Sequence, residues 1–231
     1  VPGIMVDYAV ISPAEYHYQN FGNQPYDAAL AHEFRVPVDS IPTLPMSDRK
    51  IIARRAAMEL PRSAVINLGI GIPEGVSGVA VEEGFADELT MTVEAGQIGG
   101  VPAAGAAFGG AYNPEFVPGM ISQFDFYDGG GLDVCFLGAA EVDAMGNCNV
   151  SKFTRTVGPG GFINIASNTP KCVFCGTLTA GGLKTEVRDG RLVILQEGRN
   201  KKYVKQVKQV TFSSANAVKS GQDVLFITER A

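Results

Sequence analysis

Short apolar runs alternate with helical segments along much of the chain, and this order predicts a parallel sheet. Residues 64–68 and 89–94 have the composition of β-strands, and the second run alternates apolar and polar positions. Between them, residues 74–83 place apolar side chains at helical spacing. A strand, a helix and a second strand in this order form a βαβ unit, whose strands lie parallel.

Further elements are expected on both sides of this unit. Residues 48–60 have helical composition, Ser47 suits the N-cap, and Pro61 ends the helix. Asp189-Gly190 within residues 186–194 is a hairpin signal. We also expect strands at 132–137, 172–178 and 223–228 and a short helix at 214–219. The fold class is therefore α/β, with an open, mainly parallel sheet flanked by helices.

Residues 1–45 have a different composition from the rest of the chain. An apolar stretch leads into a segment rich in Pro, Tyr, Asn and Gln, and Pro25, Pro37, Pro42 and Pro45 exclude a long helix. We expect an extended linker or arm here and an α/β domain at residues 46–231. The chain begins without methionine and stops just after a strand-like run, so we expect a fragment of a longer polypeptide.

Composition excludes several classes of protein. The net charge of −5 and pI of about 5.1 argue against a nucleic-acid partner. No segment approaches the roughly 20 apolar residues needed to cross a bilayer, so we expect no membrane partner. The four cysteines are too few for a disulfide framework. Cys172 and Cys175 would point to opposite faces of one strand, as buried thiols, which fits a cytoplasmic protein.

Histidine-dependent chemistry is not expected. Both histidines, His17 and His32, lie in the arm, so neither is well placed to activate a serine or cysteine of the domain. No Cys/His cluster has the spacing of zinc ligands, and we expect no metal site. The glycines between Gly69 and Gly75 miss the dinucleotide-binding fingerprint by one position.

Glu94 is the strongest candidate for chemistry. It closes a predicted strand and opens a glycine-rich loop, where backbone N–H groups can approach a substrate. A glutamate is already ionised at neutral pH, so it can attack an activated acyl group such as a thioester without a general base. The oxyanion that forms needs N–H donors, which glycine loops can supply.

Structural interpretations of the same residues stay open. A glutamate before glycine is often a solvated turn residue or a helix-capping partner, and runs such as 99–110 and 158–161 more often serve tight packing. Lys201, Lys202, Lys205 and Lys208 are interpreted as a solvated face, with phosphate binding as the alternative.

Three motifs, in order, resemble those of the family I CoA-transferases. They are residues 67–73 (NLGIGIP), 93–103 (VEAGQIGGVPA) and 158–162 (GPGGF). The likeness is closest to acetate/propionate CoA-transferases, which carry both halves of the enzyme on one chain. Residues 1–7 resemble the start of their second half, so the likeness spans essentially the whole chain.

The resemblance implies transfer of CoA between a short-chain acyl-CoA and a free carboxylic acid, in a ping-pong reaction. The family's glutamate becomes a glutamyl-CoA thioester, and Glu94 matches it. Gly160 and Gly161 match the turn from which we expect N–H donors to the oxyanion. The expected CoA-binding residues are Gly69, Ile70, Gly71, Gly99, Gly100, Val101, Pro102 and Ala103. CoA would be a substrate, and no permanently bound cofactor is expected.

The resemblance also implies partners and leaves alternatives. The family's first half is absent from this chain and should supply part of the acyl pocket, and a homo-oligomer is expected. Relatives acting on succinate or acetoacetate have asparagine where this chain has Ala95, which favours the acetate/propionate branch. An acyl-CoA hydrolase on the same scaffold, or a non-catalytic ligand-binding domain, remains an alternative.

Overall fold

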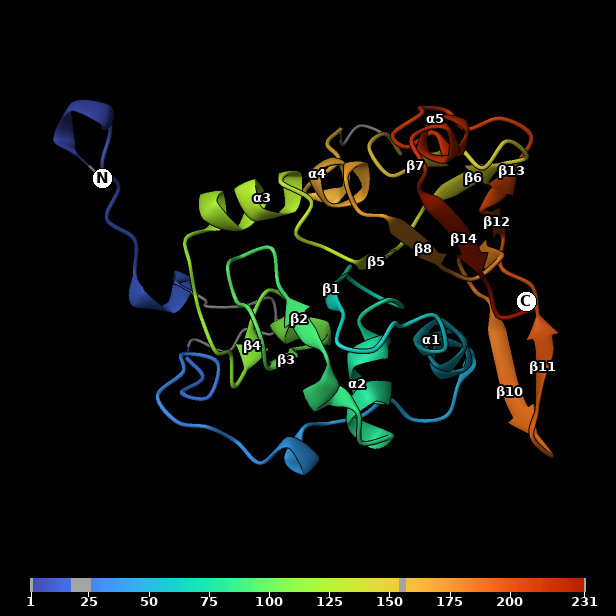
Figure 1. Ribbon diagram of the computed structural model, residues 1–231, viewed down its shortest axis with the longest axis horizontal. Coiled ribbons are helices and arrows are strands. Elements are labelled where there is room, and N and C mark those ends of the chain that lie inside the picture. Colours follow the sequence, from blue (N-terminus) through green and yellow to red (C-terminus); the bar gives the residue numbers. More distant parts are fainter. Residues whose placement is uncertain (1, 18–25, 154–156, 231) are drawn as a thin grey trace.

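A five-stranded parallel sheet forms the centre of the molecule in the computed structural model, which describes residues 2–17, 26–153 and 157–230 (Figure 1). Every neighbouring pair of its strands is parallel. In spatial order the strands are β14 (Asp223–Ile227), β8 (Lys171–Cys175), β5 (Val134–Leu137), β1 (Val65–Leu68) and β2 (Thr90–Thr92). The α/β class and all five expected strands are confirmed.

Helices cover both faces of this sheet (Figure 1). On one face lie α1 (Asp48–Ala57) and α2 (Gly75–Glu82), and on the other lie α3 (Met120–Asp128), α4 (Phe162–Ser167) and α5 (Ser214–Lys219). The predictions of α1, α2 and α5 are confirmed, and the Ser47 side chain caps α1 by accepting a hydrogen bond from the Lys50 backbone N–H. The sequence did not predict α3 and α4.

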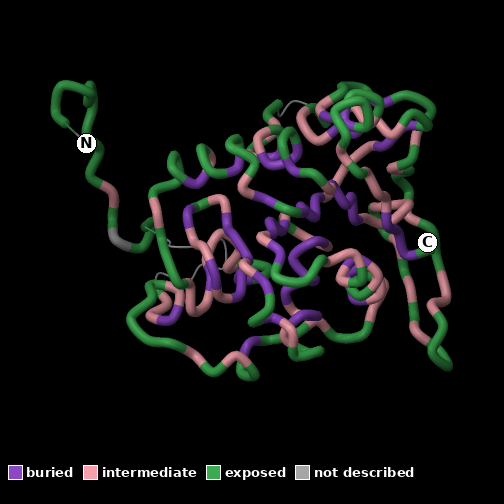
Figure 2. The backbone as a smooth tube through the Cα atoms, in the orientation of Figure 1, coloured by how far each residue is buried: buried purple, intermediate pink, exposed green. Residues whose placement is uncertain are grey.

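Successive side chains of the central strands enter different cores. On β5, Val134 and Phe136 pack with α1 and α2, whereas Cys135 and Leu137 pack with the helices of the opposite face. This alternation follows from the period of two in a strand. Figure 2 shows the buried backbone concentrated along these strands. Cys172 and Cys175 lie in opposite cores, as predicted, and all four cysteines are free and buried.

Shorter strands surround the sheet. The expected hairpin is present, and Asp189 and Gly190 turn it with φ of 50° and 72°, as a two-residue turn requires. The hairpin strands are β10 (Lys184–Arg188) and β11 (Arg191–Gln196). The others are β3 (Val101–Pro102) with β4 (Ala111–Tyr112), β9 (Thr179–Ala180) with β12 (Asn200–Lys201), and β6 (Glu141–Asp143) with β7 (Cys148–Asn149) and β13 (Tyr203–Val204).

The helices in the described part of residues 1–45 are short 3-10 turns. These are η1 (Gly3–Met5), η2 (Ala14–Tyr16) and η3 (Val38–Ser40). Residues 2–11 are exposed and extend away from the sheet (Figure 1). Val36 is tied to the domain by two hydrogen bonds of 2.8 Å, one donated by its N–H to the Asn113 side chain and one accepted from it.

Two further 3-10 turns, η4 (Ala86–Glu88) and η5 (Gly105–Ala107), occur in the domain.

Three residues used in the sequence-based expectations about the arm and the chain ends lie outside the described residues. They are Val1, Pro25 and Ala231. Within the described ranges, no helix has the length and apolar character of a bilayer span.

Candidate active site

A large cavity opens at the carboxyl ends of the parallel strands. Because these ends meet at one edge of the sheet, the residues that follow different strands come together there. Glu94 follows β2, Gly69 follows β1 and Gly138 follows β5, and all three line the cavity. Its volume is about 990 Å³, which is in the range of small-molecule sites.

The Glu94 carboxylate is half-buried in the wall of this cavity. Within the part of the chain that the structure describes, it has no hydrogen-bond or ion-pair partner. Burial raises the pKa of the Glu94 carboxyl above its ordinary value, because removing water disfavours the charged form. A carboxylate without donors keeps its lone pairs free, which suits a nucleophile better than a salt-bridged structural residue.

Gly161 lies directly against this carboxylate. A Cβ added at Gly161 would lie 2.2 Å from Glu94 Oε2 and 2.8 Å from Phe124 Cζ. Gly160 has a φ of 58°, in the left-handed region that glycine adopts readily. Among the described residues, the N–H groups of Gly160 and Gly161 donate no hydrogen bond. The turn beside the carboxylate therefore contains two backbone N–H groups without an acceptor among the described residues.

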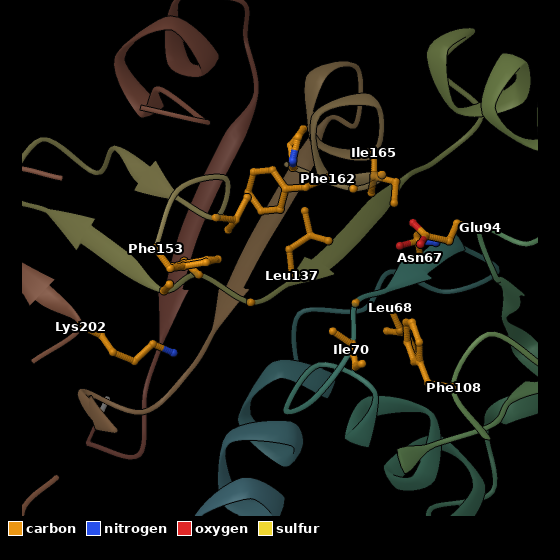
Figure 3. Close-up of a pocket in the computed structure, with 18 of the residues that line it drawn as sticks. Asn67, Leu68, Ile70, Glu94, Phe108, Leu137, Phe153, Phe162, Ile165 and Lys202 are labelled. Carbon is orange, nitrogen blue, oxygen red and sulfur yellow. The ribbon is translucent and has the colours of Figure 1, made fainter. Parts of the chain in front are cut away.

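A buried polar network lies at the end of β2, just before Glu94. The Tyr127 hydroxyl accepts hydrogen bonds from Gln123 Nε2 at 2.8 Å and Asn67 Nδ2 at 3.1 Å. It donates to Thr92 Oγ1 at 3.0 Å, and Thr92 Oγ1 donates to the Ile66 carbonyl at 2.8 Å. These bonds join α3 to the ends of β1 and β2. They fix the backbone from which Glu94 projects, with Asn67 beside it in the cavity wall (Figure 3).

Positive side chains line the opposite side of the cavity. Lys202 points into it from the side facing Glu94 (Figure 3). Lys201, Lys208 and Arg199 also line it. The interpretation of the lysine cluster as a solvated face is therefore wrong for Lys202, which is half-buried, whereas Lys205 is exposed and does not line the cavity.

The structure brings most of the residues expected at the site to this cavity. Those that line it are Glu94, Gly69, Ile70, Pro102, Ala103, Gly160 and Gly161. The remaining four do not line it: they are Gly71, Gly99, Gly100 and Val101.

Packing accounts for three of these exceptions, and backbone conformation accounts for Gly71. A Cβ at Gly100 would lie 2.1 Å from the Tyr112 carbonyl oxygen, and one at Gly99 would lie 2.8 Å from Glu115 Cγ. Val101 is buried where β3 pairs with β4. Gly71 has a φ of 92° in the turn before α2. For Gly99 and Gly100 the structure favours the tight-packing interpretation of residues 99–110.

Several residues that line the cavity were not among the expected site residues. Asn67 lies in the first glycine motif, near the carboxyl end of β1, so its place close to a strand end could have identified it. Phe108, Phe153 and Lys202 lie on separate loops and reach the cavity only through the tertiary fold (Figure 3). Among the described residues, no group of three or more His, Cys, Asp or Glu could hold a metal ion.

Comparison with known proteins gives close relatives, although no family model matches the chain. The sequence is 47% identical over 232 residues to acetate CoA-transferase YdiF of Escherichia coli strain K12, and 47% identical over 236 residues to caffeate CoA-transferase of Acetobacterium woodii. Both alignments include 100% of this chain but 43% and 45% of the relatives. The chain thus spans less than half the length of these relatives.

A solved structure agrees with this likeness. The YdiF acyl-CoA transferase of Escherichia coli O157:H7, in a thioester complex with CoA, matches with a TM-score of 0.83 at 45% identity. The match covers 99% of this chain and 42% of that chain. Sequence identity along the whole chain and the same fold at high similarity together show that this chain belongs to the family I CoA-transferases.

Proposed function

We propose that this chain carries the nucleophilic glutamate of an enzyme that transfers CoA between a short-chain acyl-CoA and a free carboxylic acid, of the acetate/propionate class. The observation that carries the proposal is the position of Glu94. Its carboxylate faces a cavity of about 990 Å³, has no partner among the described residues, and lies against Gly161, whose N–H, like that of Gly160, donates no hydrogen bond within those residues. Family membership supports the same reaction.

In the proposed first half-reaction, a Glu94 carboxylate oxygen attacks the thioester carbonyl of acyl-CoA. The C–S bond breaks, CoA leaves as a thiolate, and an acyl-glutamyl anhydride forms. The thiolate then attacks the glutamyl carbonyl of this anhydride. The donor acid leaves as a carboxylate, and Glu94 becomes a glutamyl-CoA thioester.

The second half-reaction reverses these steps with the acceptor acid. Its carboxylate attacks the glutamyl thioester and displaces the CoA thiolate, and a new anhydride forms. The thiolate attacks the acceptor acyl carbonyl, which yields the new acyl-CoA and restores the Glu94 carboxylate. No proton is transferred in either half, which agrees with a site that needs no histidine.

Each tetrahedral intermediate carries an oxyanion, which the N–H groups of Gly160 and Gly161 would stabilise. Removing one such donor typically slows a reaction about 10²- to 10³-fold. We assign Gly69, Ile70, Pro102 and Ala103 to the walls that hold the pantetheine arm, since they line the cavity beside Glu94.

The proposed enzyme also has partners. We propose that a first half, absent from this chain, completes the acyl pocket, since the chain spans less than half the length of its relatives. We also propose a homo-oligomer whose substrates are acyl-CoA and short carboxylic acids, with CoA bound only as a substrate. The four free buried thiols support a cytoplasmic location.

The test uses the complete protein, with its proposed first half. Incubation with acetyl-CoA alone, followed by borohydride, should reduce the thioester and mark Glu94, detected by mass spectrometry. Replacement of Glu94 by alanine should lower transfer by at least about 10³-fold without unfolding the protein. A variant that keeps most of its transfer rate would reject the assignment. Release of free CoA without an acceptor acid, at the rate of transfer, would indicate a hydrolase instead.

A further inference from the structure

Lys202 is held rigidly at the far side of the cavity from Glu94. Its backbone N–H donates to the Leu178 carbonyl at 3.0 Å, and its carbonyl accepts from the Val142 N–H at 2.8 Å. These two bonds fix the residue between β12 and β13. The ammonium end lies over the loop after β8, where a Cβ at Gly176 would be 2.9 Å from Nζ. The fold therefore aims this cation into the cavity (Figure 3).

The Lys202 ammonium is partly desolvated without an ion pair. Within the described residues it has no carboxylate within salt-bridge distance and donates no hydrogen bond. Glu229 is the nearby acid: its Oε2 accepts a hydrogen bond from the Leu178 N–H at 2.9 Å, and its buried Oε1 lies 3.5 Å from Arg230 Nε without a hydrogen bond among the described residues. Burial lowers the pKa of Lys202, and the charge of Glu229 opposes this shift. A bound anion would supply the missing partner.

The sheet sets the separation between Lys202 and Glu94. Glu94 follows β2 and Gly176 follows β8, and β1 and β5 lie between these strands. Three strand spacings of about 4.8 Å place the two strand ends roughly 14 Å apart. Between its sulfur and its first phosphate, the pantetheine arm has about as many bonds as four residues of extended backbone, which span roughly 13–14 Å.

We propose that Lys202 binds the diphosphate of CoA, at the phosphate attached to the pantetheine arm, while the thioester lies at Glu94. This inference rests on the proposed function, because it takes the reacting end of CoA to be at Glu94. Arg199 and Lys201 line the same side of the cavity and add positive charge there. Lys208 is already paired with Glu141 at 3.2 Å, so it is less available to the ligand.

The test compares truncated ligands in calorimetric titrations of the complete protein. The parent should bind 4′-phosphopantetheine roughly 10- to 100-fold more tightly than pantetheine, which lacks the phosphate. Lys202→Met should abolish this difference and leave the affinity for pantetheine unchanged. Lys202→Arg, which keeps the charge, should restore part of it. Lys184→Met, an exposed lysine on the hairpin outside the cavity, should behave like the parent.

Each other outcome overturns the inference. Equal loss of pantetheine and phosphopantetheine affinity would show that Lys202 supports only the fold. If Lys202→Met instead raised the KM for succinate relative to acetate and left phosphopantetheine binding intact, the cation would serve the acid substrate.

Glu94→Gln separates this inference from the proposed function. That variant should lose transfer but keep its affinity for CoA. A parent that binds CoA through Lys202 without transferring it would reject the proposed function alone, and a parent that does not bind CoA would reject both.

Discussion

Glu94 lies where burial disfavours its charged form, and this has a consequence for stability. Its pKa is raised in the folded state, so the folded chain binds more protons than the unfolded chain between the ordinary and the raised pKa. Stability therefore falls as pH rises through this window and stays lower above it. The group proposed to carry the chemistry thus weakens the fold at neutral pH.

Glu94→Gln should remove this effect while keeping the shape of the side chain. At pH 7 the variant should unfold at a urea concentration equal to or above that of the parent. Below the ordinary glutamate pKa of about 4.3 the difference should vanish, because the parent carboxyl is then neutral. Urea midpoints at the two pH values measure this. A variant less stable than the parent at pH 7 would contradict the idea that Glu94 lacks favourable contacts.

Gly161→Ala should displace the Glu94 carboxylate. The new methyl group would lie 2.2 Å from Oε2, so the carboxylate must move from its present position beside the turn. A displacement of about 1 Å can slow a reaction roughly 10²-fold. We expect this loss in kcat, measured as transfer by the complete protein. The control is Gly119→Ala, where no heavy atom lies within 4 Å of the new Cβ, and it should keep near-parental kcat.

The sequence predicted those elements in which the order of apolar and polar residues matches which side chains are buried. The central strands are apolar because they are covered on both faces, and α1 and α2 present an apolar side to the sheet. Helix α3 was missed because hydrophobicity does not follow burial along it. Its buried residues are Gln123 and Tyr127, whereas the apolar residues Met120 and Ile121 are exposed. Helix α4 has only six residues, too few for a clear period.

At the candidate site, residues in local sequence motifs were predictable, whereas residues placed by the tertiary fold were not. Glu94 and the glycines at 69, 160 and 161 were predictable because each belongs to a local motif at the end of a strand or the start of a helix. Lys202 was named only within the lysine cluster, for which a solvated face was preferred to phosphate binding. Its burial depends on the pairing of β12 with β9 and of β13 with β6. A local pattern of four lysines contains no information about how these strands pair with distant parts of the chain.

Phe174 on β8 should be a sensitive test of how the elements pack. Its ring lies 5.1 Å from Phe212, 5.2 Å from Phe226 and 5.9 Å from Phe162, measured between centroids. Phe174→Ala would open a cavity where β8, β14 and α4 meet. We expect the free energy of unfolding to fall by about 3–5 kcal/mol, measured by urea titration. Leu195→Ala on the exposed hairpin should change it by less than about 0.5 kcal/mol, and similar losses at both positions would contradict this packing.

At the scale of the whole molecule, stability should be highest at the centre of the sheet and lowest at the hairpin. Val134, Cys135 and Phe136 of β5 are fully buried, whereas β10 and β11 are half-buried or exposed along their length. Amide hydrogen exchange measures the local opening free energy. We expect the amides of β5 and β8 to exchange last and those of the hairpin to exchange at least about 10²-fold faster. Hairpin amides as slow as those of β5 would show that the hairpin is an integral part of the core.

The alternation of side chains along β5 and β8 also limits how the length of this chain can change. Because neighbouring positions enter opposite cores, one residue inserted into either strand would send every later side chain of that strand to the wrong face. Related sequences should therefore gain or lose residues at sites such as the turn at Asp189-Gly190, and almost never inside the strands that lead to the cavity.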